Sequence, residues 1–552
     1  MSRSREPLET LRNARLAPRL IEDYRPLAES LEWRLSEMYW NTAGIHGFVQ
    51  SEIPYTITSS GTLSANAARL LYANCLEHPP HGRMEVLEIG SGTALFARLF
   101  LDEFCRLCTH GKVSFHEQIT YYVTDRSPRS QAQWKEFGLL EGYPAVPALA
   151  DGFDPLSIET AEGGTRITGL RAVFCNYSLD SLPASVLRKG ENGVEELCVR
   201  THLSSDSERV RQLTSLALDG IRDLATKADP ALIPLVGVLE FEAAFLPSSR
   251  EYPHQAEALS FAHDWPRVIL NHGAIECLEK ALAGLDPSGF VLLNDYGLVR
   301  SEDAASMSAT QRFGSSAALG LNFPFLEHHF SSSGFRVLRP DLDEQAPLHA
   351  RLVTRGRIPE TSRCFHEIFD WPVQKLLLEP QEQARQHIST GRMESAKQAY
   401  ETALSSRPND WVLLGEIAEY LVRNVADYQA GLEIASAALA LNPWYSVWLW
   451  NVYGDALYAL DRFQEAHQAY RKAEAIEPED VRTNLNLAYS HSQLGNDVAA
   501  LQSIGKALAK DRGGLFRERL LEKQQQILVA ARAQETAEQE WMARRAARLA
   551  SC

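Results

Sequence analysis

Short apolar runs that end at glycine or at a polar residue recur along the first 300 residues of the chain. They span residues 85–89, 118–125, 171–176 and 289–295. Helical patterns separate these β-rich runs. This alternation predicts an α/β doubly wound domain, in which a parallel sheet places its ligand cleft at the carboxyl ends of the strands.

A different pattern begins near residue 378, where small residues recur at helical spacing. Pro408, Pro443 and Pro478 lie 35 residues apart, close to the period of about 34 residues of tetratricopeptide repeats. An irregular helical bundle would not return one pattern at a constant interval, so we predict an all-α tetratricopeptide-repeat solenoid over residues 378–511. The recurring sets are Ala396, Tyr400, Ala403; Gly431, Ala435, Ala438; Ala466, Tyr470, Ala473; and Ala500, Ile504, Ala507.

The other segments complete a predicted domain plan. Residues 1–50 have a helical pattern, and Trp33, Tyr39 and Trp40 form an aromatic face that either covers the cleft or pads the sheet; padding is favoured. A long charged helix caps the repeats, since the apolar heptads of a coiled-coil arm are not sustained. The predicted order is a helical segment (1–50), a sheet domain (51–360) with an insertion (about 188–265, including a helix over 209–226), a linker (361–377), the repeats (378–511) and the capping helix (512–552).

The run over 85–89 leads into a glycine turn. Glu88, Gly90 and Gly92 give the pattern Glu-x-Gly-x-Gly before the next helix. Glycine lets the backbone approach a nucleotide-like ligand closely. The third glycine of a dinucleotide fingerprint is replaced by Leu95, and the Gly-Lys-Ser/Thr ending of a phosphate loop is missing.

Polar residues also end the later strands. Asp125 lies at the tip of the second strand, where a carboxylate could accept both ribose hydroxyls; its alternative is a helix N-cap ahead of Pro128. Asn176 and Asp180 follow the next run, where such side chains orient a nucleophile or accept a proton.

In order, these motifs resemble the MidA-like family of class I S-adenosylmethionine (SAM) methyltransferases. That family includes mitochondrial complex I assembly factors that methylate protein arginine. The resemblance covers roughly residues 50–300 and implies SAM as the methyl donor and a protein nitrogen as the acceptor. The matching segments are Thr56–Ser60, Glu88–Gly92, Tyr122–Pro128, Asn176–Pro183 and Asn294–Gly297.

Under this resemblance the donor residues have separate roles. Gly90 and Gly92 contact the methionine part of SAM through their backbone, and Glu88 binds its amino group or a bridging water. Asp125 binds the ribose. Asp151 lies after the third strand near the adenine, or else forms a simple Asp-Gly turn.

The acceptor side departs from the family pattern Asn-Glu-x-x-Asp-x-x-Pro. The glutamate position is Tyr177, and a phenol cannot bind a guanidinium bidentately as a carboxylate does. Arginine specificity is therefore in doubt. The candidate acceptor residues are Asn176, which could hold the nitrogen by its side-chain carbonyl, Asp180, Tyr55 and Tyr296; each could instead have a structural hydrogen-bonding role.

Charge narrows the range of partners. The net charge of −16 argues against a nucleic-acid partner and mildly favours a basic peptide. The chain has no apolar stretch of about 18 residues, so no membrane partner is expected, and a secretory signal is missing.

Cysteine usage bears on the compartment and on metals. The eight cysteines are dispersed, which suits a reducing, cytoplasmic location. No metal is predicted, because Cys105 and Cys108 have no second cysteine pair to complete a zinc site.

We therefore predict a SAM-dependent methyltransferase acting on a protein or peptide that the repeats recruit. Intact Gly90, Gly92 and Asp125 favour this function. Tyr177 favours the alternative, a scaffold with a methyltransferase fold and no catalytic activity, whose repeats mediate protein contacts. A small-molecule methyltransferase is a third possibility. The methyl acceptor, the role of the insertion and the oligomeric state stay open.

Overall fold

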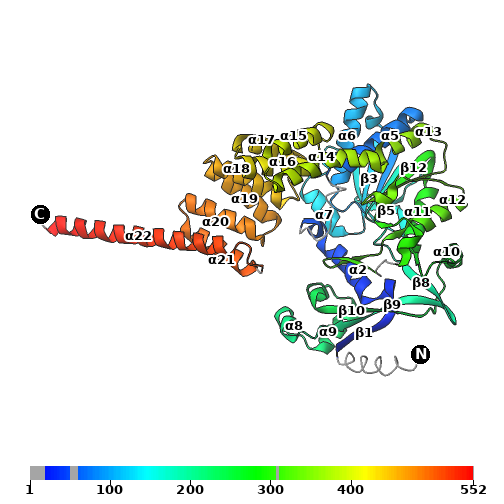
Figure 1. Cartoon of the computed structure of the whole chain (residues 1–552), viewed down its shortest axis with the longest axis horizontal. Coiled ribbons are helices and arrows are strands. Elements are labelled where there is room, and N and C mark those ends of the chain that lie inside the picture. Colours follow the sequence, from blue (N-terminus) through cyan, green and yellow to red (C-terminus); the bar gives the residue numbers. More distant parts are fainter. Residues whose placement is uncertain (1–18, 50–59, 306–309, 512, 551–552) are drawn as a thin grey trace. The chain divides into compact units, whose positions relative to one another are not determined.

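The computed structural model describes residues 19–49, 60–305, 310–511 and 513–550. Contacts within the chain divide it into two compact units, one formed mainly by residues up to 375 and the other by residues from 376 onward. The first unit is an α/β domain built on a large mixed sheet, and the second is entirely helical (Figure 1). The predicted fold class is confirmed.

Five parallel strands form the centre of the main sheet. Their order is β12-β7-β2-β3-β4, so the chain runs outward from β2 to β4 and then crosses back to β7 and β12 on the other side of β2. The boundary between β2 and β7 is the point where strand order reverses, the usual ligand position in such sheets. The strands are β2 (Met84–Ile89), β3 (Ile119–Asp125), β4 (Ala145–Asp151), β7 (Leu170–Asn176) and β12 (Leu285–Asp295).

Antiparallel strands close both edges of this sheet. On one edge β18 pairs with β12 and with β17; on the other, β5 pairs with β4 and with β6. The edge strands are β5 (Asp154–Thr160), β6 (Gly163–Arg166), β17 (Arg336–Leu338) and β18 (His349–Thr354).

Helices cover both faces of the sheet. On one face Phe100 of α6 packs against Tyr121 and Phe174, with ring centroids 5.3 and 5.1 Å away. On the other face Leu87 and Val173 belong to the same apolar cluster as buried residues of α11 and α12. The helices of this domain are α5 (Thr62–Glu77), α6 (Leu95–Gly111), α7 (Pro128–Glu136), α10 (Gln255–Phe261), α11 (His272–Ala283), α12 (Phe323–Ser332) and α13 (Pro359–Phe369).

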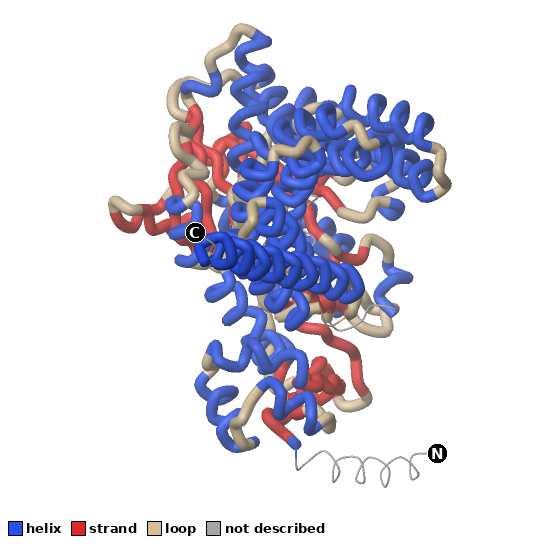
Figure 2. The backbone as a smooth tube through the Cα atoms, turned by 90° about the vertical axis from the view of Figure 1, so that its left-hand side faces the viewer, coloured by secondary structure: helices blue, strands red, loops and turns tan. Residues whose placement is uncertain are grey.

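A second, antiparallel sheet corrects the prediction for the N-terminal segment and the insertion. Its strands form a group separate from the main sheet (Figure 2). Residues 1–50 are not simply helical, because β1 pairs with β9 almost 180 residues later. Such a pairing leaves no local pattern in the sequence. The strands are β1 (Leu20–Pro26), β8 (Ser185–Gly190), β9 (Gly193–Leu203), β10 (Leu239–Pro247) and β11 (Val268–Leu270).

The insertion's single predicted helix over 209–226 is also wrong. The chain forms α8 (Ser207–Leu213) and α9 (Leu218–Lys227), with Thr214 extended between them. The Thr214 hydroxyl accepts a hydrogen bond from the Leu216 N–H at 3.0 Å. This local turn competes with the helical ladder and breaks the helix.

The N-terminal helix α2 packs against the second sheet and against α7. α2 (Leu31–Ala43) begins at Ser30, whose hydroxyl accepts the Trp33 N–H, and α3 (His46–Val49) follows it. Trp33 is fully buried in a cluster with residues of the second sheet.

Short β strands and 3-10 turns complete the unit. They are β13 (Gly297–Leu298), β14 (Gln311–Phe313), β15 (Ser316–Ala318), β16 (Leu321–Asn322), η2 (Leu27–Glu29), η3 (Phe115–Glu117), η4 (Pro230–Val238), η5 (Ser301–Ala305) and η6 (Asp343–Gln345).

The helical unit is a stack of helix pairs. The predicted small residues, among them Ala396, Ala435, Ala466 and Ala500, are buried where the helices pack. The predicted linker, residues 361–377, is helical and consists of most of α13 and the start of α14, and the boundary between the two units falls within it. The helices are α14 (Trp371–Ser389), α15 (Met393–Ser406), α16 (Trp411–Tyr420) extended by the π turn η7 (Leu421–Val425), α17 (Tyr428–Leu441), α18 (Val447–Ala459), α19 (Phe463–Ile476), α20 (Val481–Gln493), α21 (Asp497–Lys510) and α22 (Arg517–Ala550).

The first half of the last helix packs on the stack. Leu520 and Ile527 of α22 are buried against α20 and α21. Farther along, Trp541 and Met542 are exposed. The start of α22 therefore covers the end of the stack.

Candidate functional site

The glycine turn after β2 is fixed by backbone conformation and by close neighbours. Gly90 and Gly92 have φ angles of +72° and +51°, which L side chains rarely adopt. A Cβ at Gly90 would lie 2.7 Å from Cβ of Ser178, and a Cβ at Gly92 would lie 2.8 Å from the ring of Phe48. Both positions therefore need glycine.

Asp125, at the end of β3, holds this turn. Its carboxylate accepts hydrogen bonds from the Gly92 N–H at 3.0 Å and from the Ser127 N–H at 2.9 Å. The N-cap of α7 is Ser127, so the alternative N-cap role of Asp125 is not what the structure has. Burial raises the pKa of Asp125, and these backbone hydrogen bonds oppose the rise.

Glu88 is buried at the end of β2, beneath the turn. Its carboxyl group accepts a hydrogen bond from the Tyr121 hydroxyl at 3.1 Å. Burial raises the pKa of Glu88 to about 8, and the hydrogen bond from Tyr121 opposes that rise. A cationic group in the cavity would favour the ionised form.

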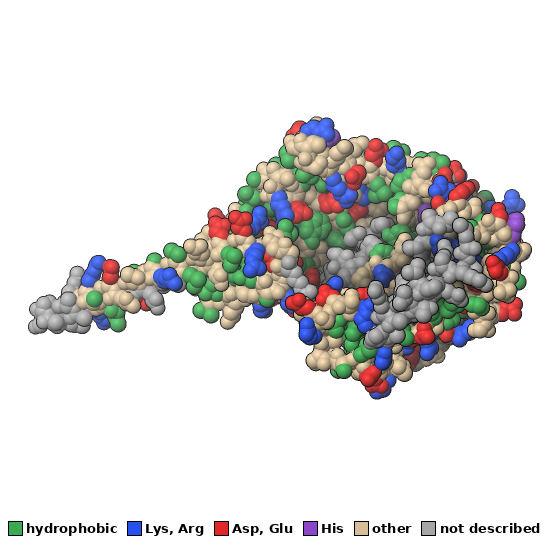
Figure 3. All heavy atoms as spheres, turned by 60° about the horizontal axis from the view of Figure 1, so that its bottom comes forward, with side chains coloured by type: hydrophobic (Ala, Val, Ile, Leu, Met, Phe, Trp, Pro, Cys, Tyr) green, Lys and Arg blue, Asp and Glu red, His purple; other side chains and the backbone are tan. Residues whose placement is uncertain are grey.

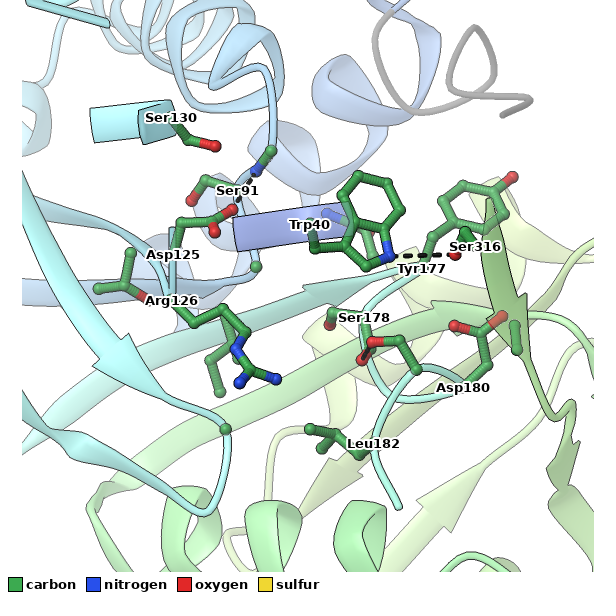
Figure 4. A pocket seen from close by; sticks show the side chains of 18 of the residues that line it. Trp40, Ser91, Asp125, Arg126, Ser130, Tyr177, Ser178, Asp180, Leu182 and Ser316 are labelled. Carbon is green, nitrogen blue, oxygen red and sulfur yellow. Dashed lines mark hydrogen bonds between the residues drawn. The ribbon is translucent and has the colours of Figure 1, made fainter. Parts of the chain in front are cut away.

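One cavity joins these groups to the end of β7. It has an empty volume of about 1470 Å³, part of it open to solvent, and Glu88, Gly90, Gly92 and Asp125 line it. Figure 4 shows Asp125 and Arg126 on one side and Tyr177, Ser178 and Asp180 on the other. The cavity thus lies where the strand order of the sheet reverses.

Helix α2 supplies the cover of this cavity. Trp40 lines it and donates from Nε1 to the Ser316 hydroxyl at 3.0 Å (Figure 4). The Phe48 ring lies 5.1 Å from the Trp40 ring, also at the cavity. The expectation that the N-terminal aromatic residues only pad the sheet is therefore wrong for Trp40, although it suits the buried Trp33.

The acceptor candidates at the end of β7 form a polar group with unpaired atoms. Asn294 donates from Nδ2 to the Asn176 side-chain oxygen at 2.9 Å. The Asn176 amide nitrogen and the Ser178 hydroxyl are buried and have no hydrogen-bond partner among the described residues. The unpaired atom of Asn176 is therefore its side-chain nitrogen. Its side-chain carbonyl, which we expected to hold the acceptor nitrogen, is hydrogen-bonded to Asn294. Asn176 and Ser178 both line the cavity, where their unpaired atoms can hydrogen-bond to a polar ligand or to water.

Tyr177 and Tyr296 form an aromatic pair at the same end of the cavity. Their ring centroids are 5.0 Å apart, and both residues line the cavity. Tyr177 has a φ angle of +51°. A bulky residue in this conformation is strained, and such strain is often found at functional sites.

Two carboxyl groups lie beneath the tyrosines. Asp295 is buried at the end of β12 and accepts hydrogen bonds from the N–H groups of Leu179 and Asp180 at 3.1 and 3.3 Å. Burial raises the pKa of Asp180 to about 7. Burial and the neighbouring Asp180 raise the pKa of Asp295. The pair can therefore hold or accept a proton near neutral pH.

One predicted residue, Asp151, does not line this cavity. The Asp151 carboxylate is exposed and accepts the Phe153 N–H at 2.8 Å, which is the turn alternative, while its neighbours Ala150 and Gly152 line the cavity. Tyr55 lies outside the described residues.

The sequence interpretation missed several lining residues. Ser178, Arg126 and Ser316 all line the cavity, and so does Phe313. Ser178 and Arg126 directly follow predicted strand ends, so their positions held a usable signal. Ser316 and Phe313 belong to a short hairpin, β14–β15, that no sequence pattern predicted.

Comparisons with known proteins agree with the two-part architecture. Residues 384–410 and 447–480 match models of the tetratricopeptide repeat, which confirms the repeat prediction there. No curated protein gives a significant match. No helix in the described part of the chain is long and apolar enough to span a membrane.

Solved structures resemble each part separately. A COG1565 superfamily member from Burkholderia thailandensis, bound to S-adenosyl-homocysteine, is 16% identical over 60% of this chain and 78% of its own, with a TM-score of 0.36. A thermophilic tetratricopeptide-repeat protein from Thermus thermophilus is 20% identical over 28% of this chain and 82% of its own, with a TM-score of 0.25. At these TM-scores the likenesses carry no functional conclusion.

Proposed function

We propose that this chain is a SAM-dependent methyltransferase that modifies a nitrogen atom of a protein or peptide. One observation carries the proposal: Gly90, Gly92 and Asp125 line the same cavity as Asn176 and Asp180, at the reversal point of the sheet. This brings a nucleotide-type donor site next to a polar acceptor site.

The donor side of the cavity fits SAM chemically. Gly90 and Gly92 line the cavity with backbone atoms alone, and the methionine part can bind to this backbone. Glu88 offers a carboxylate to a cationic amino group. Asp125 offers its remaining lone pairs to ribose hydroxyls, with its orientation set by the N–H groups of Gly92 and Ser127.

The protein's part in the reaction is positioning, exclusion of water and removal of a proton. SAM, when bound, supplies an electrophilic methyl group. Trp40 and Phe48 line the cavity and limit the access of water to a bound substrate. Asn176 and Ser178 offer unpaired polar atoms that can orient the acceptor. Asp180 can take up the proton that the acceptor nitrogen loses.

The acceptor side suits an amine better than a guanidinium. Tyr177 and Tyr296 present two aromatic rings, which attract a compact cation. An alkylammonium group must lose a proton before it can attack, and a carboxylate with a pKa near 7 can take it. A guanidinium needs a bidentate acid, which Tyr177 cannot provide. A lysine side chain or a chain N-terminus is the acceptor we propose.

The repeats supply a surface for recruiting the substrate. The first helices of successive pairs, α16, α18 and α20, contact one another along the stack. These contacts are more extensive than those between the second helices, α17, α19 and α21. In a curved stack the helices that approach more closely lie on the inner side, the side that solenoids use for binding. On these helices Asp455 accepts hydrogen bonds from Asn486 at 3.0 Å and from Arg482 at 2.7 Å, and the nearby Arg423 pairs with Glu419.

Nucleic acid is not among the proposed partners. Cationic and anionic side chains are interspersed over the described residues of the face in Figure 3. A nucleic-acid surface would instead gather cations.

Calorimetric titration of the full-length protein with SAM and with S-adenosylhomocysteine tests the proposal. We expect one binding site for each compound on each chain. If neither binds at high micromolar concentration, the proposal is wrong. Transfer of radiolabelled methyl from SAM to a lysine-rich or an arginine-rich peptide then identifies the acceptor.

The second candidate is a scaffold without methyl transfer. Tyr177 in place of the family acid favours it, and it predicts that repeat-dependent partner binding persists while no methyl group is transferred. A small-molecule methyltransferase predicts instead that SAM binds and that deleting the repeats leaves KM unchanged.

A further inference from the structure

A second group of chemically active side chains lies outside the cavity. It brings together His254, just before α10, Glu257 on α10, Glu279 on α11 and His329 on α12. None of these residues lines the cavity described above. Ligand atoms of His254, Glu279 and His329 all lie within 4.8 Å of one another.

We propose that His254, His329 and Glu279 bind a divalent transition-metal ion of the Zn²⁺ class. Nε2 of each histidine points to the same carboxylate oxygen, Oε1 of Glu279, at 3.5 Å from His254 and 3.1 Å from His329. Ligands about 2.1 Å from a tetrahedral zinc are separated by about 3.4 Å. The two separations therefore match those around such an ion, with one coordination position left for water.

Glu257 takes the role of an orienting carboxylate. It lies 3.0 Å from Nδ1 of His329 and 3.7 Å from Nδ1 of His254, on the side of each ring opposite to Glu279. Histidine ligands of metals usually donate their other N–H to such a carboxylate, which fixes the tautomer. Both imidazoles thus have one nitrogen directed at Glu257 and the other directed at Glu279.

Charge also favours a cation here. Within the described residues, every ion pair of Glu257 and Glu279 is made to a histidine and none to Lys or Arg. Both carboxylates therefore face imidazoles and no other cationic side chain among the described residues. A divalent ion would neutralise both.

The backbone at His254 adds an independent observation. His254 has a φ angle of +61°, although it is not glycine. This strained conformation directs its ring to His329, with ring centroids 4.5 Å apart. Strain of this kind persists where the surrounding contacts require it.

The metal would clamp the insertion to the main domain. His254 and Glu257 lie between β10 and β11 of the second sheet, whereas Glu279 and His329 lie on helices that cover the main sheet. Coordination would therefore tie the segment around α10 to α11 and α12. This inference is independent of the proposed methyl transfer.

Zinc titration of tag-free, full-length protein treated with a chelator tests the inference. We expect one Zn²⁺ bound per chain by elemental analysis after gel filtration, a higher Tm with zinc, and slower hydrogen exchange over residues 251–262. Glu279→Gln, which keeps the side-chain shape, and His254→Ala should each weaken zinc binding more than about tenfold, and Glu257→Gln about 10- to 100-fold.

His328→Ala is the matched control. His328 is on the same helix as His329 and lies 3.9 Å from Glu257, so zinc binding should be retained. If wild-type protein retains no zinc and its Tm does not respond to the ion, the group is only a hydrogen-bonded histidine and acid cluster. Equal zinc retention by Glu279→Gln and wild type would also overturn the proposal.

Discussion

Gly90 and Ser178 pack so closely that a Cβ on Gly90 would lie 2.7 Å from Cβ of Ser178. The two residues follow β2 and β7, the neighbouring strands between which the sheet order reverses. This contact joins the donor turn to the acceptor loop. A substitution in the donor turn should therefore shift the acceptor loop, and a substitution in the acceptor loop should shift the donor turn.

Gly90→Ala should lower the free energy of unfolding by about 1–3 kcal/mol, because alanine is strained at φ +72° and clashes with Ser178. SAM binding should be lost in calorimetry, because the turn must shift. Gly142→Ala is the control for strain alone, since Gly142 has φ +81° and no atom within 4 Å of an added Cβ. Normal SAM affinity in Gly90→Ala would contradict this role of the turn.

Asp125→Asn should weaken SAM binding about tenfold or more, the equivalent of about 1.4 kcal/mol, because an amide loses one acceptor oxygen. Stability should fall as well, since the Asp125 carboxylate accepts two backbone N–H groups. Asp151→Asn is the matched control, and we expect no change in affinity because Asp151 only holds a turn. Calorimetry of both variants decides whether the ribose is bound at Asp125 or elsewhere.

Stability should fall as pH rises from about 4 to about 7. The folded protein holds a proton on Asp180, whose pKa is about 7, while the unfolded chain has released it above about pH 4. The folded state therefore binds more protons in this range, and raising the pH favours unfolding. Denaturant titration should show a shallower pH dependence for Asp180→Asn.

Methyl transfer should have the opposite pH dependence, rising through about pH 7 as Asp180 becomes able to accept a proton. Asp180→Asn should remove this rise near pH 7 from the pH dependence of kcat. A profile that is unchanged in the variant would assign the proton acceptor to another group.

Tyr177→Glu should shift methyl transfer from amine to arginine peptides. A carboxylate at 177 offers the two oxygens that bind a guanidinium, and it removes one ring of the aromatic pair. Tyr177→Phe keeps the ring and should keep the preference for amines. Mass spectrometry of methylated lysine and arginine peptides compares the variants, and identical products from Tyr177→Glu and wild type would rule out control by this position.

Arg423→Ala should raise KM for a protein substrate about fivefold, the effect of losing a contact of about 1 kcal/mol, with little change in kcat. Arg462→Ala is the matched control. Arg462 has a similar exposed fraction, 42% against 43%, and both arginines pair with a glutamate close in sequence. Arg423 also lies 3.7 Å from Asp455 of α18, on the inner face, whereas Arg462 precedes α19, the second helix of its pair. An equal effect of both variants would refute recruitment by the inner face.

The sequence predicted those features that local patterns encode. Apolar runs ending in polar residues located β2, β3, β7 and β12, because a buried parallel strand needs a continuous apolar segment. The spacing of Pro408, Pro443 and Pro478 located the repeats. Glu88, Gly90, Gly92 and Asp125 could be assigned to one cavity because parallel strands bring their carboxyl ends to the same edge.

Contacts between distant segments decided the rest. β1 is a strand only because it pairs with β9, and Trp40 covers the cavity only because it reaches Ser316, 276 residues later. Likewise, His254, Glu279 and His329 meet only where three helical segments pack together. Periodicity and spacing indicate which face of each segment is buried, and the sequence alone determines this. Which distant segments then meet depends on packing in three dimensions, and only the tertiary structure supplies that.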